Sequence, residues 1–252
     1  MRFAGILAAA LCAAAGAAGA PGQVSIAAAA NLTQAIGALD AGFKSEHPDV
    51  DVTLALGSSG SFVAQIENGA PFDVFLSADM GFPAALARSG HADAATLVPF
   101  AVGRLVLWTM NPAVDVSGVA ASVKSPAART LAIANTRTAP YGRAARQALE
   151  GLGLWDAVQP RLVTAEDISQ AAQFVETGNA DAGFVALSAV LSPKLRGRGR
   201  WIEVPAALFT PLVQGAIITS HGSANPASAA YVAFLRGDAA RKVLEAAGYG
   251  AP

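Results

Sequence analysis

The sequence predicts an α/β protein built as two lobes. From Val24 onward, short apolar runs alternate with stretches of helical periodicity, which indicates βαβ units and a parallel sheet covered on both faces. A second series of this kind begins at Gly103, and 252 residues suffice for two separate cores. Ligands of open α/β sheets lie at the carboxyl ends of the strands, so two facing lobes would enclose one site between them.

The first 20 residues have the layout of a secretory signal peptide. Arg2 gives a basic start, residues 3–15 are apolar, and small residues follow before Pro21. The Ala/Gly stretch is too weakly apolar for a membrane anchor, so we expect export. Cys12 is the only cysteine and is preceded by Leu11, which is too large for the usual lipid-attachment site. The exported mature protein is therefore expected to carry neither a lipid anchor nor a disulfide.

The first lobe is expected to alternate strands and helices. VSIAAAA (residues 24–30) reads as a buried strand, and Asn31 as the cap of the helix that follows. DVTLAL (51–56) is the next strand, and GSSGS starts a helix that contains Phe62 and Ile66. FDVFLSAD (72–79) forms a third strand before a short helix over residues 83–88.

The second lobe repeats this order from residue 103. Strands are expected at GRLVLWTM (103–110), TLAIANT (130–136), RLVTAED (161–167), AGFVALS (182–188) and WIEVP (201–205), with helices over 141–149 and 168–175. LVQGAIITS (212–220) and two helices, capped by Asn225 and Asp238, complete the chain. The chain would cross between lobes near 100–103 and 205–211. This assigns residues 21–101 plus 211–252 to lobe 1 and 102–210 to lobe 2.

Composition excludes several classes of partner. Only 14% of the residues are charged and the formal net charge is -1, so no broad basic field draws the protein to nucleic acid or anionic lipid. Beyond the leader, the apolar run at 105–110 is much too short to span a membrane.

Four turns after strands share one chemistry. They place Asn31, Ser58 with Ser59, Tyr141, and Ile168 at helix starts, where free backbone N–H groups carry partial positive charge. The first three turns add a side chain that can donate, so together they resemble an anion site made of neutral groups. Taken singly, each has a simpler explanation: Asn and Ser are common N-caps, and a tyrosine is more often a packed aromatic.

Catalytic chemistry finds less support. His47, His91 and His221 lie in no motif with a serine or an acid, and GxSxG, GxxxxGK[ST], HExxH and GxGxxG do not occur. Glu166 and Asp167 are adjacent, but acids are favoured in a first helical turn anyway. With scattered histidines and no mature cysteine a metal cage is not expected, and neither is a cofactor.

The stretches AAAANLTQAI, GSSGSFVAQIENGAPFDVFLSAD, TLAIANTRTAPYGRAARQAL, LVTAEDISQAAQFVETGNADAGFVALS and FLRGDAARKVLEAAGYG resemble the periplasmic molybdate-binding proteins of ABC importers. The resemblance covers nearly all of the mature chain. It implies a type 2 periplasmic-binding-protein fold with two crossovers and a ligand cleft between the lobes. It also implies a monomer that is not an enzyme and delivers molybdate, or tungstate, to an ABC permease in the inner membrane.

The same resemblance implies which residues hold the oxyanion, and with it the metal, through hydrogen bonds alone. Asn31 and Ser59 match the first two turns of the family, Tyr141 the P-x-G turn, and Ile168 the backbone donor after ED, with Ser58 as a second-rank candidate. One branch of the family has a tyrosine where this chain has Ala186, also a second-rank position. We expect Tyr141 to supply that phenol from elsewhere in the cleft.

Two alternatives stay open. The nearer is a binding protein for sulfate or another tetrahedral oxyanion, which the same turns would serve. The other is an exported serine hydrolase with Ser59 as nucleophile, for which the sequence offers no adjacent base.

Overall fold

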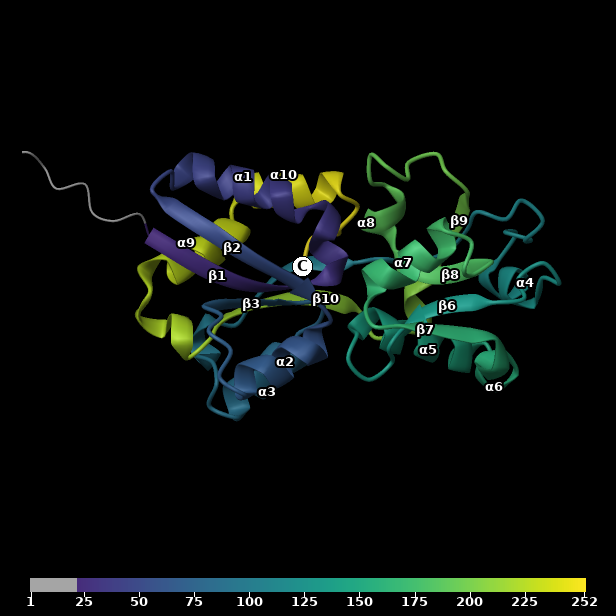
Figure 1. The fold of residues 1–252 in the computed structure, drawn as a ribbon, viewed down its shortest axis with the longest axis horizontal. Helices are drawn as coiled ribbons and strands as arrows, with labels where there is room; N and C mark the ends of the chain where they lie inside the picture. The colour runs from purple at the N-terminus through teal and green to yellow at the C-terminus, as the bar shows by residue number, and fades with distance from the viewer. Residues whose placement is uncertain (1–21) are drawn as a thin grey trace, which may run out of the picture.

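The computed structural model describes residues 22–252 and confirms the two-lobed α/β architecture (Figure 1). The expected signal peptide and Cys12 lie outside the described residues. Two five-stranded sheets organise the chain, in the orders β2-β1-β3-β10-β4 and β7-β6-β8-β5-β9. We call the first sheet with its helices lobe 1 and the second lobe 2.

Lobe 1 has a sheet covered on both faces. The helices α1, α9 and α10 pack over one face, and α2 and α3 over the other (Figure 1). Because β1 lies between β2 and β3 in a sheet covered on both faces, Ile26 joins the core on one face and Ala27 the core on the other, which explains the continuous apolar run. The elements are β1 (Gly22–Ala29), η1 (Ala30–Gln34), α1 (Ile36–Glu46), β2 (Val50–Gly57), α2 (Ser59–Glu67), β3 (Val74–Ser77), α3 (Gly81–Arg88), η2 (Ala94–Thr96), β4 (Val98–Gly103), β10 (Leu212–Ile218), η5 (His221–Ala224), α9 (Pro226–Leu235) and α10 (Asp238–Ala246).

Lobe 2 is built in the same way around one large apolar cluster that includes Trp108 and Phe184. The helices α7 and α8 lie over one face of its sheet, and α5 and α6 over the other (Figure 1). Its elements are β5 (Leu105–Thr109), α4 (Val119–Lys124), β6 (Leu131–Ala134), α5 (Pro140–Gly151), α6 (Trp155–Val158), η3 (Gln159–Arg161), β7 (Leu162–Ala165), α7 (Ile168–Glu176), β8 (Ala182–Ala186), α8 (Leu187–Val190), β9 (Arg200–Glu203) and η4 (Ala206–Leu208).

The expectation of purely parallel sheets is wrong at the strands next to the crossings. The strand β1 pairs in parallel with β2 and β3, and β6 with β7 and β8. In contrast, β10 runs antiparallel to β3 and β4, and β5 runs antiparallel to β8 and β9. These strands enter directly from the other lobe without a crossover helix, so nothing forces a parallel direction on them. The sequence analysis also missed β4, whose Pro99 suits only an edge strand.

Two helix starts differ from expectation. Asn31 is not an N-cap: it lies inside the 3₁₀ helix η1, and α1 begins only at Ile36. Gly237 precedes α10, and Asp238 is the first helical residue rather than the cap. The cap expected at Asn225 is confirmed, since its side chain accepts a hydrogen bond from the Ala227 N–H.

The chain passes between lobes at Arg104, which separates β4 from β5, and again between β9 and β10. Gly103 pairs with Leu212 on the lobe 1 side, and Val106 with Glu203 on the lobe 2 side, so the two passages run side by side. Within residues 22–252, no helix has the length and apolar character needed to cross a membrane.

Candidate anion-binding site

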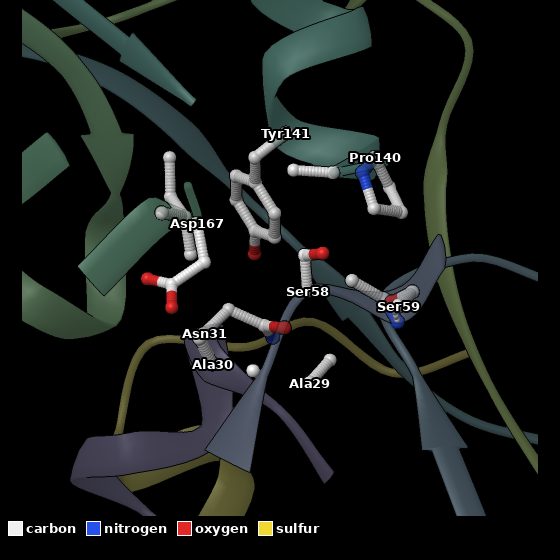
Figure 2. A pocket seen from close by; sticks show the side chains of 12 residues that line it. Ala29, Ala30, Asn31, Ser58, Ser59, Pro140, Tyr141 and Asp167 are labelled. Carbon is white, nitrogen blue, oxygen red and sulfur yellow. Dashed lines mark hydrogen bonds between the residues drawn. The ribbon is translucent and has the colours of Figure 1, made fainter. Parts of the chain in front are cut away.

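A small cavity lies between the two lobes (Figure 2). It brings together Asn31, Ser58, Ser59, Tyr141 and Ile168, which come from four separate turns of the two lobes. The buried Ala186, at the end of β8, is not among the lining residues. The complete lining is Ala29, Ala30, Asn31, Gly57, Ser58, Ser59, Ala78, Ala139, Pro140, Tyr141, Asp167 and Ile168.

Helix starts supply backbone donors to this cavity. The helix α7 begins at Ile168, and Asp167 Oδ1 accepts from the N–H groups of Ser169 (2.8 Å) and Gln170 (3.0 Å). The Ile168 N–H is therefore left without a capping partner. The helix α5 has no side-chain cap and begins with Pro140, so the next N–H group, that of Tyr141, is also uncapped. Such N–H groups attract anions because the helix dipole adds to their own polarity.

Ser59 offers its hydroxyl proton to the cavity. Its Oγ accepts the N–H of Ala78 at 3.0 Å, so the hydroxyl hydrogen is not needed for that bond. Ser58 is the N-cap of α2, and its hydroxyl lies 2.7 Å from that of Ser61. The two serines therefore differ: Ser58 caps the start of α2, whereas the hydroxyl hydrogen of Ser59 is not engaged by that cap.

Tyr141 points its hydroxyl into the cavity (Figure 2). The residue is only 1% exposed, and that hydroxyl makes no hydrogen bond to any residue in the described part of the chain. Burial, with a smaller effect of the neighbouring Tyr249, raises the phenol pKa well above its ordinary value. Tyr141 therefore stays protonated and presents a donor with no protein acceptor.

Asn31 departs from the expectation of a free side-chain donor. Its Nδ2 donates to Gln214 Oε1 at 2.8 Å and to the Tyr249 hydroxyl at 2.9 Å. The Tyr249 hydroxyl in turn donates to the Asn31 carbonyl at 2.6 Å. Asn31 Oδ1 is buried and has no hydrogen-bond partner within residues 22–252. The donor that Asn31 leaves free is its backbone N–H at the start of η1.

Gln214 and Tyr249 are the polar residues next to the cavity that the sequence analysis missed. Burial raises the pKa of Tyr249 to about 12, so this phenol also stays protonated. Both residues lie far from Asn31 in sequence. The one available signal was a glutamine inside the apolar run LVQGAIITS, because a buried polar side chain needs a partner.

The cavity is nearly free of formal charge. None of its lining residues is Lys, Arg or His, and Asp167 is the one acid, already engaged with the α7 backbone. The cavity is small, with a volume of about 10 Å³, so only a compact solute can occupy it. No group of three or more His, Cys, Asp or Glu side chains within residues 22–252 is placed to hold a metal ion directly.

The lobes are hydrogen-bonded to each other around this cavity. Gly60 N–H donates to the Thr138 carbonyl at 2.8 Å, and Ser169 Oγ to the Ala30 carbonyl at 2.8 Å. Ser188 Oγ donates to the Asn31 carbonyl at 3.0 Å. The structure therefore shows the closed arrangement, in which both lobes contribute donors to one small space.

Two α/β lobes that close on a small cavity lined by hydrogen-bond donors define a solute-binding protein. Residues 24–250 match the family model described as "Bacterial extracellular solute-binding protein", and the chain belongs to this family. Proteins of this kind work outside the cytoplasm.

Several relatives share this architecture over most of their length. The chain is 44% identical to "Molybdate-binding protein ModA" of Azotobacter vinelandii, covering 90% of each protein. It is 40% identical to the protein of the same name from Rhodobacter capsulatus, covering 91% of this chain and 89% of that one. The solved structure of the Azotobacter vinelandii periplasmic molybdate-binding protein superposes with a TM-score of 0.85 and 34% identity, covering 91% of this chain and 99% of the other. These relatives carry the names of binding proteins, not of enzymes.

Proposed function

We propose that this protein captures molybdate or tungstate in the periplasm and delivers it to an ABC permease in the inner membrane. The observation that carries the proposal is the meeting of donors from four turns and both lobes in one small cavity without cationic side chains. The two ModA relatives support it, because both are named for molybdate.

The chemistry suits a tetrahedral dianion. Ser59 and Tyr141 supply hydroxyl donors, while Asn31, Tyr141 and Ile168 supply backbone N–H groups at helix starts. Each hydrogen bond to a charged group contributes roughly 1.5–3 kcal/mol, so about five of them would offset the cost of ordering and closure. We assign no catalytic residue and no resident cofactor, and the oxyanion carries its metal as cargo.

We infer different roles for the candidate residues. Ser58 acts through the α2 cap rather than as a principal ligand, and Ala186 does not line the cavity. Tyr141 has the free phenol that the resemblance leads us to expect, while Asn31 contributes its backbone. We further propose that the protein acts as a monomer, without nucleic acid, after removal of the signal peptide.

Isothermal titration of the purified mature protein with molybdate, tungstate, sulfate and phosphate tests this function. Molybdate and tungstate should bind alike, because both are fully deprotonated and nearly equal in size. Sulfate has the same charge but is smaller, so it cannot reach all donors at once and should bind more weakly. Tighter binding of sulfate would instead favour the related function of a sulfate-binding protein.

Phosphate tests the donor-rich character of the shell. Hydrogen phosphate carries a proton that needs an acceptor, and most of this shell cannot accept it. The possible acceptors are the unpaired Oδ1 of Asn31 and the hydroxyl oxygens of Ser59 and Tyr141, so phosphate binding as tight as that of molybdate would contradict a shell that acts through donors alone. Turnover assays with ester and phosphate substrates should show no activity, because no histidine lines the cavity beside Ser59.

A further inference from the structure

We propose that the strands at the two lobe crossings, β4 and β10, also position the ligand donors. Gly103 at the end of β4 is a positioning residue for the Tyr141 hydroxyl, and Gln214 in β10 is one for the turn of Asn31, whose backbone N–H is the donor and whose side chain Gln214 anchors. This inference rests on the proposed function and extends it to residues that do not line the cavity.

Gly103 is required for space rather than for backbone conformation. It is not among the glycines with positive φ, so its backbone would accept any residue. A Cβ atom at Gly103, however, would overlap the Tyr141 hydroxyl oxygen and would lie 2.9 Å from Tyr141 Cζ and 2.8 Å from Gln214 Nε2. The phenol therefore occupies the place where any other residue would have its side chain.

This contact joins the two lobes. Gly103 ends a strand of the lobe 1 sheet, while Tyr141 starts the helix α5 of lobe 2. Figure 2 shows the Tyr141 ring descending from α5 with its hydroxyl toward Asn31 and Ser58. The hydroxyl occupies that position only in the closed arrangement, in which the start of α5 lies against the end of β4. Gly103 thus determines how far Tyr141 can advance as the lobes close.

Gln214 lies outside the cavity lining and is hydrogen-bonded to the Asn31 side chain. It is fully buried, and its Nε2 donates to the carbonyls of Leu212 (3.0 Å) and Ala78 (3.3 Å). Because both donors are directed at carbonyls, Oε1 is the atom that faces Asn31, and it accepts the Asn31 Nδ2 hydrogen. Exchanging the two ends of the Gln214 amide would set oxygen against oxygen, so Gln214 fixes the direction of the Asn31 amide.

A double-mutant cycle on Gly103 and Tyr141, measured by titration with molybdate, tests whether Gly103 positions the Tyr141 hydroxyl. Gly103→Ala should weaken binding about tenfold or more, the loss of one charge-assisted hydrogen bond. In the Tyr141→Ala background the same substitution should cost clearly less, because the phenol is gone and only the contact with Gln214 Nε2 remains. Gly37→Ala is the matched control, because a Cβ there would meet no atom within 4 Å. Equal losses in both backgrounds, or parent-like binding by Gly103→Ala, would overturn the proposal.

A ligand-free measurement separates this inference from the proposed function. Crystal structures of apo Gly103→Ala and of the apo parent in the same crystal form should differ: the variant should have its lobes further apart or, where the lobes are closed in both, its Tyr141 ring rotated away from residue 103. If the parent protein binds no oxyanion, the proposed function fails, and the displacement still decides the positioning role. A hydroxyl that stays in place would contradict it.

The role of Gln214 in positioning Asn31 is tested by Gln214→Leu in the parent and in the Asn31→Ala background. Gln214→Leu should weaken molybdate binding about tenfold in the parent, because the Asn31 amide and its backbone turn lose their anchor. It should add little when Asn31 is already alanine. A loss that is the same in both backgrounds would show that Gln214 only stabilises the fold, and the melting temperature of each apo variant measures that contribution separately.

Discussion

Ser59 is the side chain that we propose as the principal hydroxyl donor of lobe 1. Its Oγ accepts the Ala78 N–H, which leaves its hydrogen available for a ligand in the cavity that it lines. Ser59→Ala should weaken molybdate binding by roughly 10- to 150-fold, equivalent to ~1.5–3 kcal/mol. Titration calorimetry measures this, with the exposed Ser223→Ala as a control expected to bind like the parent.

Ser59→Asp makes the same test sharper. A carboxylate at this position would face the dianion at close range, so binding should be lost altogether. Tight binding by the aspartate variant would exclude Ser59 from the site.

Tyr141→Phe removes one hydroxyl and keeps the ring. If the phenol donates to the ligand, affinity should fall by ~1.5–3 kcal/mol, while the melting temperature of the apo protein should scarcely change. The reverse result, unchanged affinity with reduced stability, would mean that Tyr141 only fills space. Adding Ala186→Tyr to Tyr141→Ala is not expected to restore full affinity, because Ala186 is buried away from the cavity lining and a ring there would overpack its surroundings.

The residues that sequence reasoning found and missed differ in one physical respect. Ser59, Tyr141 and Ile168 occupy helix starts, which a local pattern reveals because N–H groups there lack partners. Gln214 and Tyr249 act through contacts with Asn31 that span 183 and 218 positions of the chain. No local pattern encodes such a pairing, so the true partners of the Asn31 amide became evident only in the folded structure.

Helices and strands also differ in whether a local pattern or a distant pairing determines them. Amphipathic helices such as α5 and α7 were located from the sequence because their period of about 3.6 is visible in a single segment. Both β10 and β5 follow a passage of the chain from the other lobe, and this passage sets their antiparallel direction. The residues within a strand carry no signal for it. The edge strand β4 was missed for a related reason, since its pairing with β10 comes from a distant part of the chain.

The helices α5 and α3 form a contact that we expect to hold the closed lobes together. Arg143 of α5 makes an ion pair with Asp79 just before α3, and its guanidinium lies 5.3 Å from the centre of the Phe82 ring. Asp79 also accepts the Phe82 N–H at 3.0 Å, which fixes the carboxylate. The contact joins lobe 2 to lobe 1 beside the cavity.

Arg143→Ala should therefore favour dissociation of the ligand. Because the Arg143 side chain is 43% exposed, solvent screens the pair, and we expect only a 2- to 10-fold or so weakening, mainly through a faster off-rate measured by stopped-flow. Arg146→Ala is the control on the same helix, since Arg146 pairs with Glu150 inside α5 and makes no contact across the lobes. Equal effects of the two variants would show that α5 stability, not closure, is affected.

The two lobes and their paired crossings make the whole molecule suited to hinge motion. Only Arg104 and the segment between β9 and β10 connect the sheets, and they lie side by side, so a small rotation there would separate the lobes. The donors in the cavity come from both sides. Opening would therefore leave Asn31 and Ser59 on one lobe, and Tyr141 and Ile168 on the other.

Ligand binding should accordingly change the shape of the protein. Without an anion, the helix starts of the two lobes present positive ends to one another across a cavity nearly free of charge, which favours separation. A dianion between them reverses the sign of that interaction, and the hydrogen bonds Gly60–Thr138 and Ser169–Ala30 can then form. Small-angle scattering should give a smaller radius of gyration with molybdate than without, and Ser59→Asp should show no such change. If the parent binds molybdate by calorimetry but keeps its radius, the apo protein is already closed or the ligand sits within one lobe, and the hinge mechanism is wrong.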